Sequence, residues 1–195
     1  MLKDYRIRAA IILVAAALIG GTALLVSWMR APEYAGSHIG GPFTLTDQTG
    51  KRVTEQDFRG KLALIYFGFV FCPDACPTAL SAMTDAIEAL GPAGEDVTPV
   101  FITVDPERDT VAVMKDYAEA FHPRLKALTG SMEEISKVAK EYRVYFKKAA
   151  ETGPNEYQVD HSSIVFLMGR DGRYLTHFTH MTLPDQMAAE IKKRL

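Results

Sequence analysis

The chain has 195 residues, with 22 lysines and arginines against 24 aspartates and glutamates, and a formal net charge of −2 at pH 7. This balance lacks the basic excess that nucleic-acid binding needs, so we expect no nucleic-acid partner. Only two cysteines are present, which excludes a fold held together by several disulfides and allows one at most.

The N-terminal part contains a long uncharged segment. Residues 9–28 run without a charged side chain, and as a helix they span about 30 Å, the thickness of a bilayer core. Basic residues precede the segment at positions 3, 6 and 8, which predicts a cytoplasmic N-terminus. The segment is long for a signal peptide, and no clean cleavage site follows it. We therefore expect residues 1–30 to be a transmembrane anchor, residues 31–39 a linker, and residues 40–195 one exported domain.

The exported part is predicted to begin with a hairpin. Residues 43–46 and 52–54 have the composition of short strands, and residues 47–50 between them carry a turn signal. Residues 55–58 are expected to form one helical turn. Residues 62–70 are an uncharged run of β-branched, aromatic and aliphatic residues, which predicts a strand buried on both faces at the centre of a sheet.

Both cysteines lie in the turn after this strand. Cys72 and Cys76 each precede a proline, and because proline pushes the residue before it out of the α region, we expect both to be non-helical. A helix is predicted over residues 78–90, with Pro77 suited to its start. Cys76 would then lie at or next to the N-cap, where free N–H groups favour a thiolate. We expect the two thiols to converge at the carboxyl edge of the sheet.

The remaining elements alternate between strands and helices. Strands are predicted over residues 97–104, 125–128, 144–147, 164–167 and 174–178, and helices over residues 111–121, 131–142 and 184–195. Ser131 and Glu134 form a capping box, Asp109 or Thr110 is the expected cap of the helix before it, and residues 169–172 are the turn of a hairpin. The order β-α-β-α, then a β-hairpin and a final helix, predicts a thioredoxin-like α/β fold.

The cysteine pair alone allows three interpretations: a structural disulfide or buried thiol pair, a redox-active dithiol, or a soft-metal site for Cu(I), zinc or an iron–sulfur cluster. A third ligand would distinguish them. His161 is the strongest candidate, because it follows Asp160 and stands just before a predicted core strand, where thioredoxin folds bring the chain beside the redox pair. The other histidines lie in the linker, at a helix end or at a strand end: His38, His122, His177 and His180.

The spacing of these residues indicates a site that the fold assembles in advance. His161 lies 85 residues after Cys76, and closing a flexible loop of that length costs on the order of several kcal/mol. The folded sheet must therefore place the ligands before a metal binds. Two thiolates and one imidazole leave a metal short of four protein ligands, which suits three-coordinate Cu(I) or tetragonal Cu(II) better than a closed zinc site.

Six blocks in the domain carry a family resemblance. They are residues 39–43, 66–69, 71–78, 103–110, 142–145 and 159–162, and the Cys-Pro-x-x-Cys-Pro turn combined with the later Asp-His-Ser is the most specific feature. The sequence resembles the SCO/SenC family, membrane-anchored copper-binding proteins of cytochrome c oxidase assembly. The resemblance implies that Cys72, Cys76 and His161 bind copper and that Cys72 and Cys76 are also a redox-active pair. Asp105 and Arg108 are interpreted either as part of a turn and helix cap or as residues that support the site or face a partner.

The resemblance implies a copper metallochaperone, holding Cu(I) or Cu(II), for the binuclear copper (CuA) centre of cytochrome c oxidase subunit II. Other copper chaperones are further expected partners. The alternative is an enzyme, a membrane-tethered thiol–disulfide oxidoreductase that reduces its target through the two cysteines alone. A peroxidase-like interpretation lacks the Thr-x-x-Cys pattern. Because the N-terminal region is short and lacks a transit-like presequence, we expect a bacterial inner membrane protein with a periplasmic domain rather than a mitochondrial one.

Overall fold

The structure is a computed structural model that describes residues 39–150, 157–179 and 181–195. Ser37–Leu195 form one compact unit. Within the described residues, no helix has the length and apolar character that crossing a membrane requires. The anchor predicted over residues 1–30 lies outside this part of the chain, as do all but the last residue of the linker predicted over residues 31–39, and His180.

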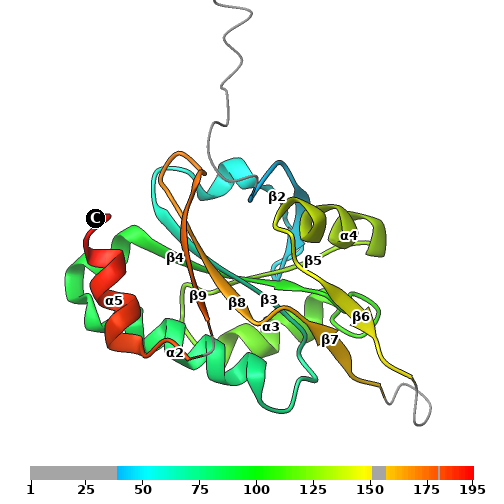
Figure 1. Cartoon of the computed structure of the whole chain (residues 1–195). Coiled ribbons are helices and arrows are strands. Elements are labelled where there is room, and N and C mark those ends of the chain that lie inside the picture. The colour runs from blue at the N-terminus through cyan, green and yellow to red at the C-terminus, as the bar shows by residue number, and fades with distance from the viewer. Residues whose placement is uncertain (1–38, 151–156, 180) are drawn as a thin grey trace, which may run out of the picture. The chain divides into compact units, whose positions relative to one another are not determined.

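A seven-stranded mixed sheet forms the centre of the unit (Figure 1). The three inner strands, β5 (Lys126–Thr129), β4 (Val97–Thr103) and β3 (Leu62–Gly68), are parallel, and the strands outside them are joined antiparallel. A second, two-stranded sheet pairs β6 (Phe146–Lys148) with β7 (Val159–His161). In spatial order the large sheet contains β2 (Arg52–Thr54), β1 (Thr44–Asp47), β5 (Lys126–Thr129), β4 (Val97–Thr103), β3 (Leu62–Gly68), β8 (Ile164–Met168) and β9 (Tyr174–Thr179).

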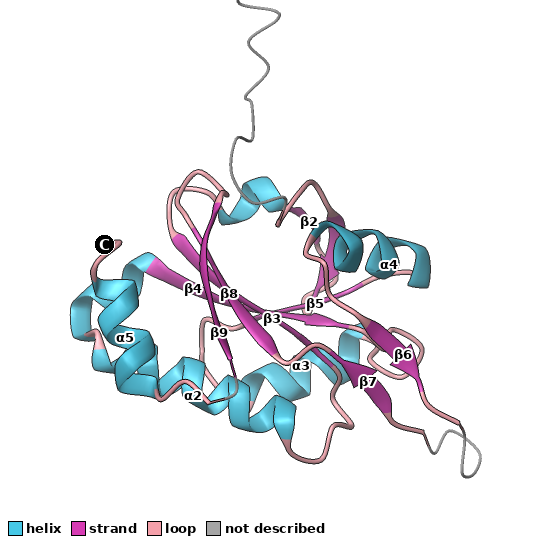
Figure 2. Cartoon of the chain, viewed as in Figure 1, coloured by secondary structure: helices cyan, strands magenta, loops and turns pink. Residues whose placement is uncertain are grey.

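Helices cover both faces of the sheet (Figure 2). The crossovers between the parallel strands are α2 (Ala75–Ala89) and α3 (Val111–Glu119), and right-handed connections place both on one face. On that face α5 (Pro184–Lys192) packs against α2, whereas α4 (Met132–Glu141) contacts β1 from the other side. Two short 3₁₀ helices, η1 (Glu55–Phe58) and η2 (Gly91–Asp96), complete the described elements.

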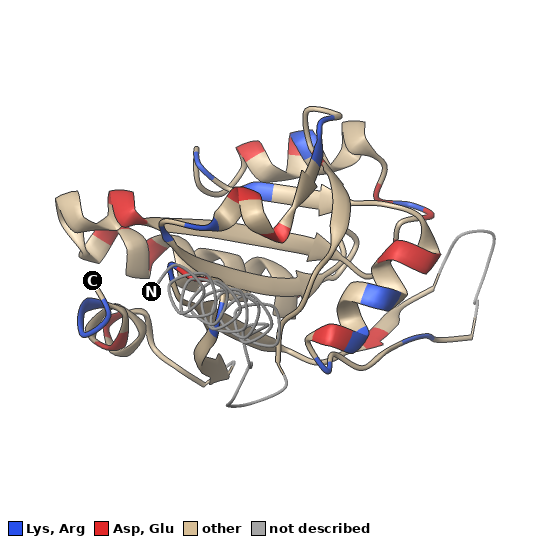
Figure 3. Cartoon of the chain, turned by 90° about the horizontal axis from the view of Figure 1, so that it is seen from above, with Lys and Arg blue, Asp and Glu red and all other residues tan. Residues whose placement is uncertain are grey.

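The predicted central strand is confirmed. All seven residues of β3 are buried, and β3 lies between β4 and β8. The ring of Phe67 packs in one cluster with the rings of Tyr142 and Phe166, at centroid distances of 5.3 and 6.2 Å. Charged residues of both signs are interspersed over the helices and loops, while the central strands carry almost none (Figure 3). The uncharged run in the sequence therefore corresponds to a strand covered on both faces.

Two local predictions are also confirmed. The hairpin of β8 and β9 pairs Ile164 with Thr179 and Phe166 with His177. In the capping box of α4, Ser131 Oγ accepts a hydrogen bond from the N–H of Glu134 at 3.2 Å, and the Ser131 N–H donates to the Glu134 carboxylate at 2.8 Å. These motifs were predictable because their hydrogen bonds join residues that are close in the sequence.

The predicted start of the helix after the central strand is wrong. α2 begins at Ala75 with Asp74 as its N-cap, so Cys76 is the second helical residue and Pro77 the third. Cys72 lies outside the helix, as predicted. Proline is tolerated here because the first N–H groups of a helix have no intrahelical partner to lose. The preference of the residue before proline for extended backbone is overridden at Cys76.

The pairing of β8 with β3 determines where the histidine segment lies. These strands run antiparallel, with Ala63 opposite Met168 and Tyr66 opposite Val165. The chain that enters β8 therefore lies beside the chain that leaves β3. The cysteine turn follows β3, and His161 lies three residues before the start of β8, so sheet topology brings two distant parts of the sequence to one edge.

A buried carboxylate links the ends of β3 and β4 at this edge. Asp109 is fully buried, and its Oδ2 accepts hydrogen bonds from the Val70 N–H at 3.1 Å and the Thr103 hydroxyl at 2.6 Å. Its other oxygen, Oδ1, has no hydrogen-bond partner among the described residues. Burial of the charged form raises the pKa of Asp109 to about 6. The helix cap is the neighbouring Thr110, whose side chain accepts from the Val113 N–H.

Asp109 is expected to make the folded protein less stable as the pH rises. Because its pKa is higher in the folded than in the unfolded chain, the folded state holds the proton more tightly. The stabilising contribution is complete below about pH 4 and is lost as the pH rises through about 6, a change of about 3 kcal/mol. Asp109→Asn removes this dependence, so its stability relative to the unmodified chain should rise between pH 4 and pH 7. Urea unfolding measures the difference, and the exposed Asp116→Asn is the control. A constant difference across the range would contradict the assignment.

Candidate metal centre

Three side chains that can bind a metal meet at the edge described above. The Sγ atoms of Cys72 and Cys76 and a ring nitrogen of His161 lie within 4.8 Å of one another. His161 Nε2 is 3.5 Å from Cys76 Sγ. No other group of histidine, cysteine or acidic residues in the described part of the chain is arranged in this way. The structure therefore brings together the three residues that the sequence singled out.

Cys72 is the more accessible of the two thiols. It is partly exposed, whereas Cys76 is fully buried, and both are free thiols. The backbone N–H of Cys72 donates to the carbonyl of Phe69 at 3.2 Å, which shapes the turn. The N–H of Cys76, in the first turn of α2, donates to Cys72 Sγ at 3.4 Å. The free N–H at the start of the helix is therefore directed at the sulfur of Cys72 rather than at that of Cys76.

Cys76 lies in a close-packed position that is shielded from solvent. Burial raises the pKa of its thiol above the ordinary range, so the predicted thiolate at Cys76 is wrong for the metal-free chain. The Tyr66 hydroxyl donates to Cys76 Sγ at 3.9 Å. A Cβ atom added at Gly68 would lie 2.6 Å from the same sulfur. Only glycine at this position of β3 leaves room for the Cys76 side chain.

The surroundings of His161 favour a neutral imidazole that could act as a ligand. Its ring meets the edges of the Tyr66 and Phe69 rings at centroid distances of 6.0 and 5.8 Å. Burial lowers the pKa of His161 below its ordinary value, which favours the neutral imidazole. Nδ1 lies 3.4 Å from the carbonyl oxygen of Ser162. Since a carbonyl only accepts hydrogen bonds, this contact assigns the proton to Nδ1 and leaves the lone pair of Nε2 directed toward Cys76.

The donor set has a clear chemical preference. Two sulfurs and one imidazole nitrogen suit soft or borderline ions such as Cu(I), Cu(II) and zinc. A metal held by three protein ligands keeps room for exchange, in contrast to a closed four-ligand structural site. The same two thiols lie four residues apart at a helix start and can also form a disulfide.

The other histidines that the structure describes do not join this group. His122 accepts a hydrogen bond from the Arg124 N–H at 3.1 Å and so stabilises the turn after α3. The exposed His177 contacts the Tyr174 hydroxyl on β9. Neither therefore offers a ligand to the cysteine pair.

Several residues around the site were not predicted from the sequence to have a role of their own. Tyr66, Gly68 and Phe69 contact Cys76 or His161, and Tyr157 contacts Asp105 and Arg108. In the sequence, the first three belong to an apolar run and Tyr157 follows a polar loop. Aromatic residues beside a cysteine turn are the one signal that could have pointed to Tyr66 and Phe69.

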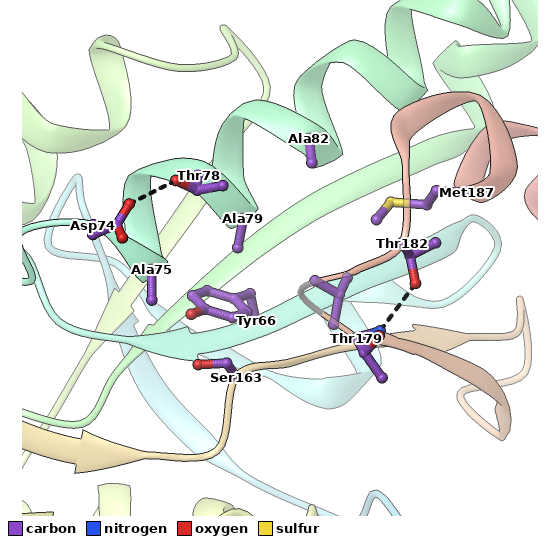
Figure 4. A pocket seen from close by; sticks show the side chains of 11 residues that line it. Tyr66, Asp74, Ala75, Thr78, Ala79, Ala82, Ser163, Thr179, Thr182 and Met187 are labelled. Atoms are coloured by element: carbon purple, nitrogen blue, oxygen red, sulfur yellow. Dashed lines mark hydrogen bonds between the residues drawn. The ribbon is translucent and has the colours of Figure 1, made fainter.

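A pocket of about 380 Å³ lies next to the metal-binding group (Figure 4). Tyr66 forms part of its wall and also contacts Cys76, so the pocket and the thiols share one side chain. Figure 4 shows Asp74 and Ser163 near Tyr66 at one end, and Met187 and Thr182 at the other. The remaining lining residues come from α2, β8 and β9: Ala75, Thr78, Ala79, Ala82, Val165 and Thr179.

Comparisons with known proteins agree with this geometry. A family model described as SCO1/SenC matches residues 31–195. A SCO2-like protein of Rickettsia felis is 40% identical over 195 residues, which cover 93% of this chain and 95% of that protein.

Solved structures give the same result. Bradyrhizobium japonicum ScoI with copper bound is 46% identical with a TM-score of 0.75, covering 80% of this chain and 99% of that one. BsSco, described as a member of the Sco family of cytochrome c oxidase assembly proteins with a disulfide switch, is 29% identical with a TM-score of 0.63, covering 80% and 92%. These likenesses confirm the predicted thioredoxin-like α/β fold. Together with the match over residues 31–195, they show that the chain is a copper-binding protein of the SCO1/SenC family.

Proposed function

We propose that the chain is a copper metallochaperone that binds copper through Cys72, Cys76 and His161 and supports assembly of the CuA centre of cytochrome c oxidase subunit II. The observation that carries the proposal is the convergence of these three donor atoms within 4.8 Å in a chain of a copper-binding family. The description of BsSco as belonging to a family of oxidase assembly proteins supports the choice of target.

The unequal exposure of the ligands supports delivery rather than permanent storage. Cys76 is fully buried, whereas Cys72 and His161 are partly exposed, so Cys76 would anchor the metal and the other two ligands would leave it accessible. A ligand from a partner protein can bind a three-coordinate ion without first displacing one of the ligands that hold it. Subunit II and other copper chaperones are the partners we propose for this exchange.

A second candidate function is thiol–disulfide exchange. It is favoured by the two free thiols at the start of α2 and by the disulfide switch described for BsSco. In this reaction the dithiol of Cys72 and Cys76 is oxidised to a disulfide while a disulfide of the target is reduced to two thiols. Two electrons and two protons pass to the target, so its cysteines become competent to receive copper.

The proposed location follows from the N-terminal sequence. We propose that residues 1–30 anchor the chain in a bacterial inner membrane, with the N-terminus in the cytoplasm and residues 40–195 in the periplasm. The uncharged segment 9–28 and the basic residues before it support this orientation.

Deletion of the gene in its own organism tests the proposed function. Loss of assembled oxidase that is restored by added copper, and by the intact gene but not by His161→Ala, is the result expected for copper delivery. Full complementation by His161→Ala without rescue by copper would instead assign the chain to thiol reduction. Normal oxidase assembly in the deletion strain, with or without copper, would overturn both functions.

A further inference from the structure

A nearly buried ion pair lies in the turn after β4. Arg108 Nε donates to Asp105 Oδ2 at 2.5 Å, and the two side chains are only 13% and 3% exposed. The Tyr157 hydroxyl donates to the second carboxylate oxygen at 2.8 Å, and Arg108 Nη1 donates to the Tyr157 carbonyl at 3.1 Å. The guanidinium carbon also lies 3.7 Å from the centroid of the Tyr157 ring. Charge, hydrogen bonds and stacking thus hold the guanidinium in one orientation.

The same guanidinium faces two rings of the cysteine turn. Its carbon is 5.0 Å from the centroid of Phe71 and 5.8 Å from that of Phe69, within the range of cation–π attraction. Phe71 directly precedes Cys72 and is 52% exposed, so little else covers it. Phe69 carries the carbonyl that accepts from the Cys72 N–H, and its ring meets the ring of His161 at 89°.

Arg108 therefore connects the two chain segments that supply the ligands. Through Phe69 and Phe71 it contacts the segment that carries Cys72. Through Tyr157 it contacts the segment that enters β7 and ends at His161. The cysteines and His161 lie on separate elements, and the relative position of these elements decides whether three donor atoms can share one ion.

We propose that Arg108, held by Asp105 and Tyr157, is a positioning residue that sets the placement of Cys72 relative to His161 and thereby the affinity and geometry of bound copper. This inference rests on the proposed copper ligands and adds a residue that does not itself touch the metal. Asp105 and Tyr157 orient the guanidinium, and the rings of Phe69 and Phe71 transmit that orientation to the ligands.

The test compares purified full-length Arg108→Met and Arg108→Lys with the unmodified chain. In Arg108→Met, we expect one copper per chain, an affinity lower by about tenfold or more, and a shifted sulfur-to-Cu(II) absorption band and Cu(II) EPR spectrum. Arg108→Lys keeps the charge near Asp105 but loses the planar stacking group, so it should restore the affinity only in part. Chelator competition gives the affinity.

A copper-free measurement accompanies the titration. Alkylation of Cys72 in the metal-free chain, followed by mass spectrometry, should be several-fold faster in Arg108→Met because Phe71 no longer rests on the guanidinium. The control is Arg124→Met. The side chain of Arg124 is likewise partly buried, at 29% exposed, and donates to the backbone carbonyls of Val97 and Gly94, at the opposite end of β4. The Arg124→Met variant should leave the copper spectrum and the alkylation rate of Cys72 unchanged.

The outcomes separate this inference from the proposed function. A folded Arg108→Met that keeps the copper affinity, spectrum and alkylation rate of the unmodified chain would overturn the positioning role, and so would an Arg124→Met with the same shifts. If Arg108→Met does not fold, Tyr157→Phe replaces it, and an unshifted spectrum in that variant would also overturn the role. If the unmodified chain itself binds no copper, the proposed ligand set fails and this inference fails with it.

Discussion

Replacing His161 by alanine is expected to lower the affinity for copper by at least about 100-fold. Loss of a residue that only supports a ligand costs 10- to 100-fold, and removal of a ligand should cost at least as much. The fold should survive, because His161 contributes mainly edge contacts with Tyr66 and Phe69, worth about 1 kcal/mol. Metal analysis gives the copper stoichiometry, chelator competition gives the affinity, and thermal unfolding reports on the fold.

His177→Ala is the matched control for this experiment. His177 lies on β9 and is exposed, and its ring contacts Tyr174 on the same strand. Its removal should leave copper affinity and spectrum unchanged. If His161→Ala bound copper with the stoichiometry and spectrum of the unmodified chain, the assignment of His161 as a ligand would be wrong.

Gly68→Ala is expected to damage both stability and the metal centre. The new methyl group would lie 2.6 Å from Cys76 Sγ, 2.9 Å from the Phe101 ring and 3.0 Å from the Tyr66 ring. All three neighbours are fully buried, so none can move away without disturbing the core. Overpacking of this kind costs about 1–3 kcal/mol. Because the displaced group is a proposed ligand, the copper affinity should fall as well, which denaturant unfolding and chelator competition measure separately.

Gly130→Ala provides the comparison. Its added Cβ would lie 2.7 Å from a carboxylate oxygen of Glu134, at the outer end of a partly exposed side chain, and 3.1 Å from Leu45. Its stability cost should be smaller, and its copper affinity should equal that of the unmodified chain. A Gly68→Ala protein with unchanged stability and unchanged copper binding would show that Cys76 is not confined by β3.

Local patterns predicted most of the fold, because each depends on residues that are close in the sequence. The uncharged run of β3 predicted a central strand, and Ser131 with Glu134 predicted a capped helix. The predicted start of α2 was wrong because two local rules compete there. Proline disfavours a helical conformation for the residue before it, yet proline itself fits the first turn of a helix. The structure extends the helix back to Ala75 and so moves Cys76 into the core.

The composition of the candidate metal site could be predicted, but its electrostatics could not. Cys72, Cys76 and His161 were identified from residue types and from their places beside strands. The raised pKa of Cys76 depends on burial by β3 and α2, which no local pattern reports. Contacts such as that of Tyr157 with Asp105 join residues 52 positions apart. Such contacts follow from the packing of whole elements.

The antiparallel pairing of β3 with β8 has a consequence for repeated use of the protein. In a zinc finger, metal binding supplies the folding energy, and the empty protein unfolds. Here backbone pairing already holds the ends of both strands together, so losing the ion removes only the extra stability that a bound ligand provides. If it delivers copper as proposed, a protein built in this way can release its cargo, remain intact while empty, and be loaded again.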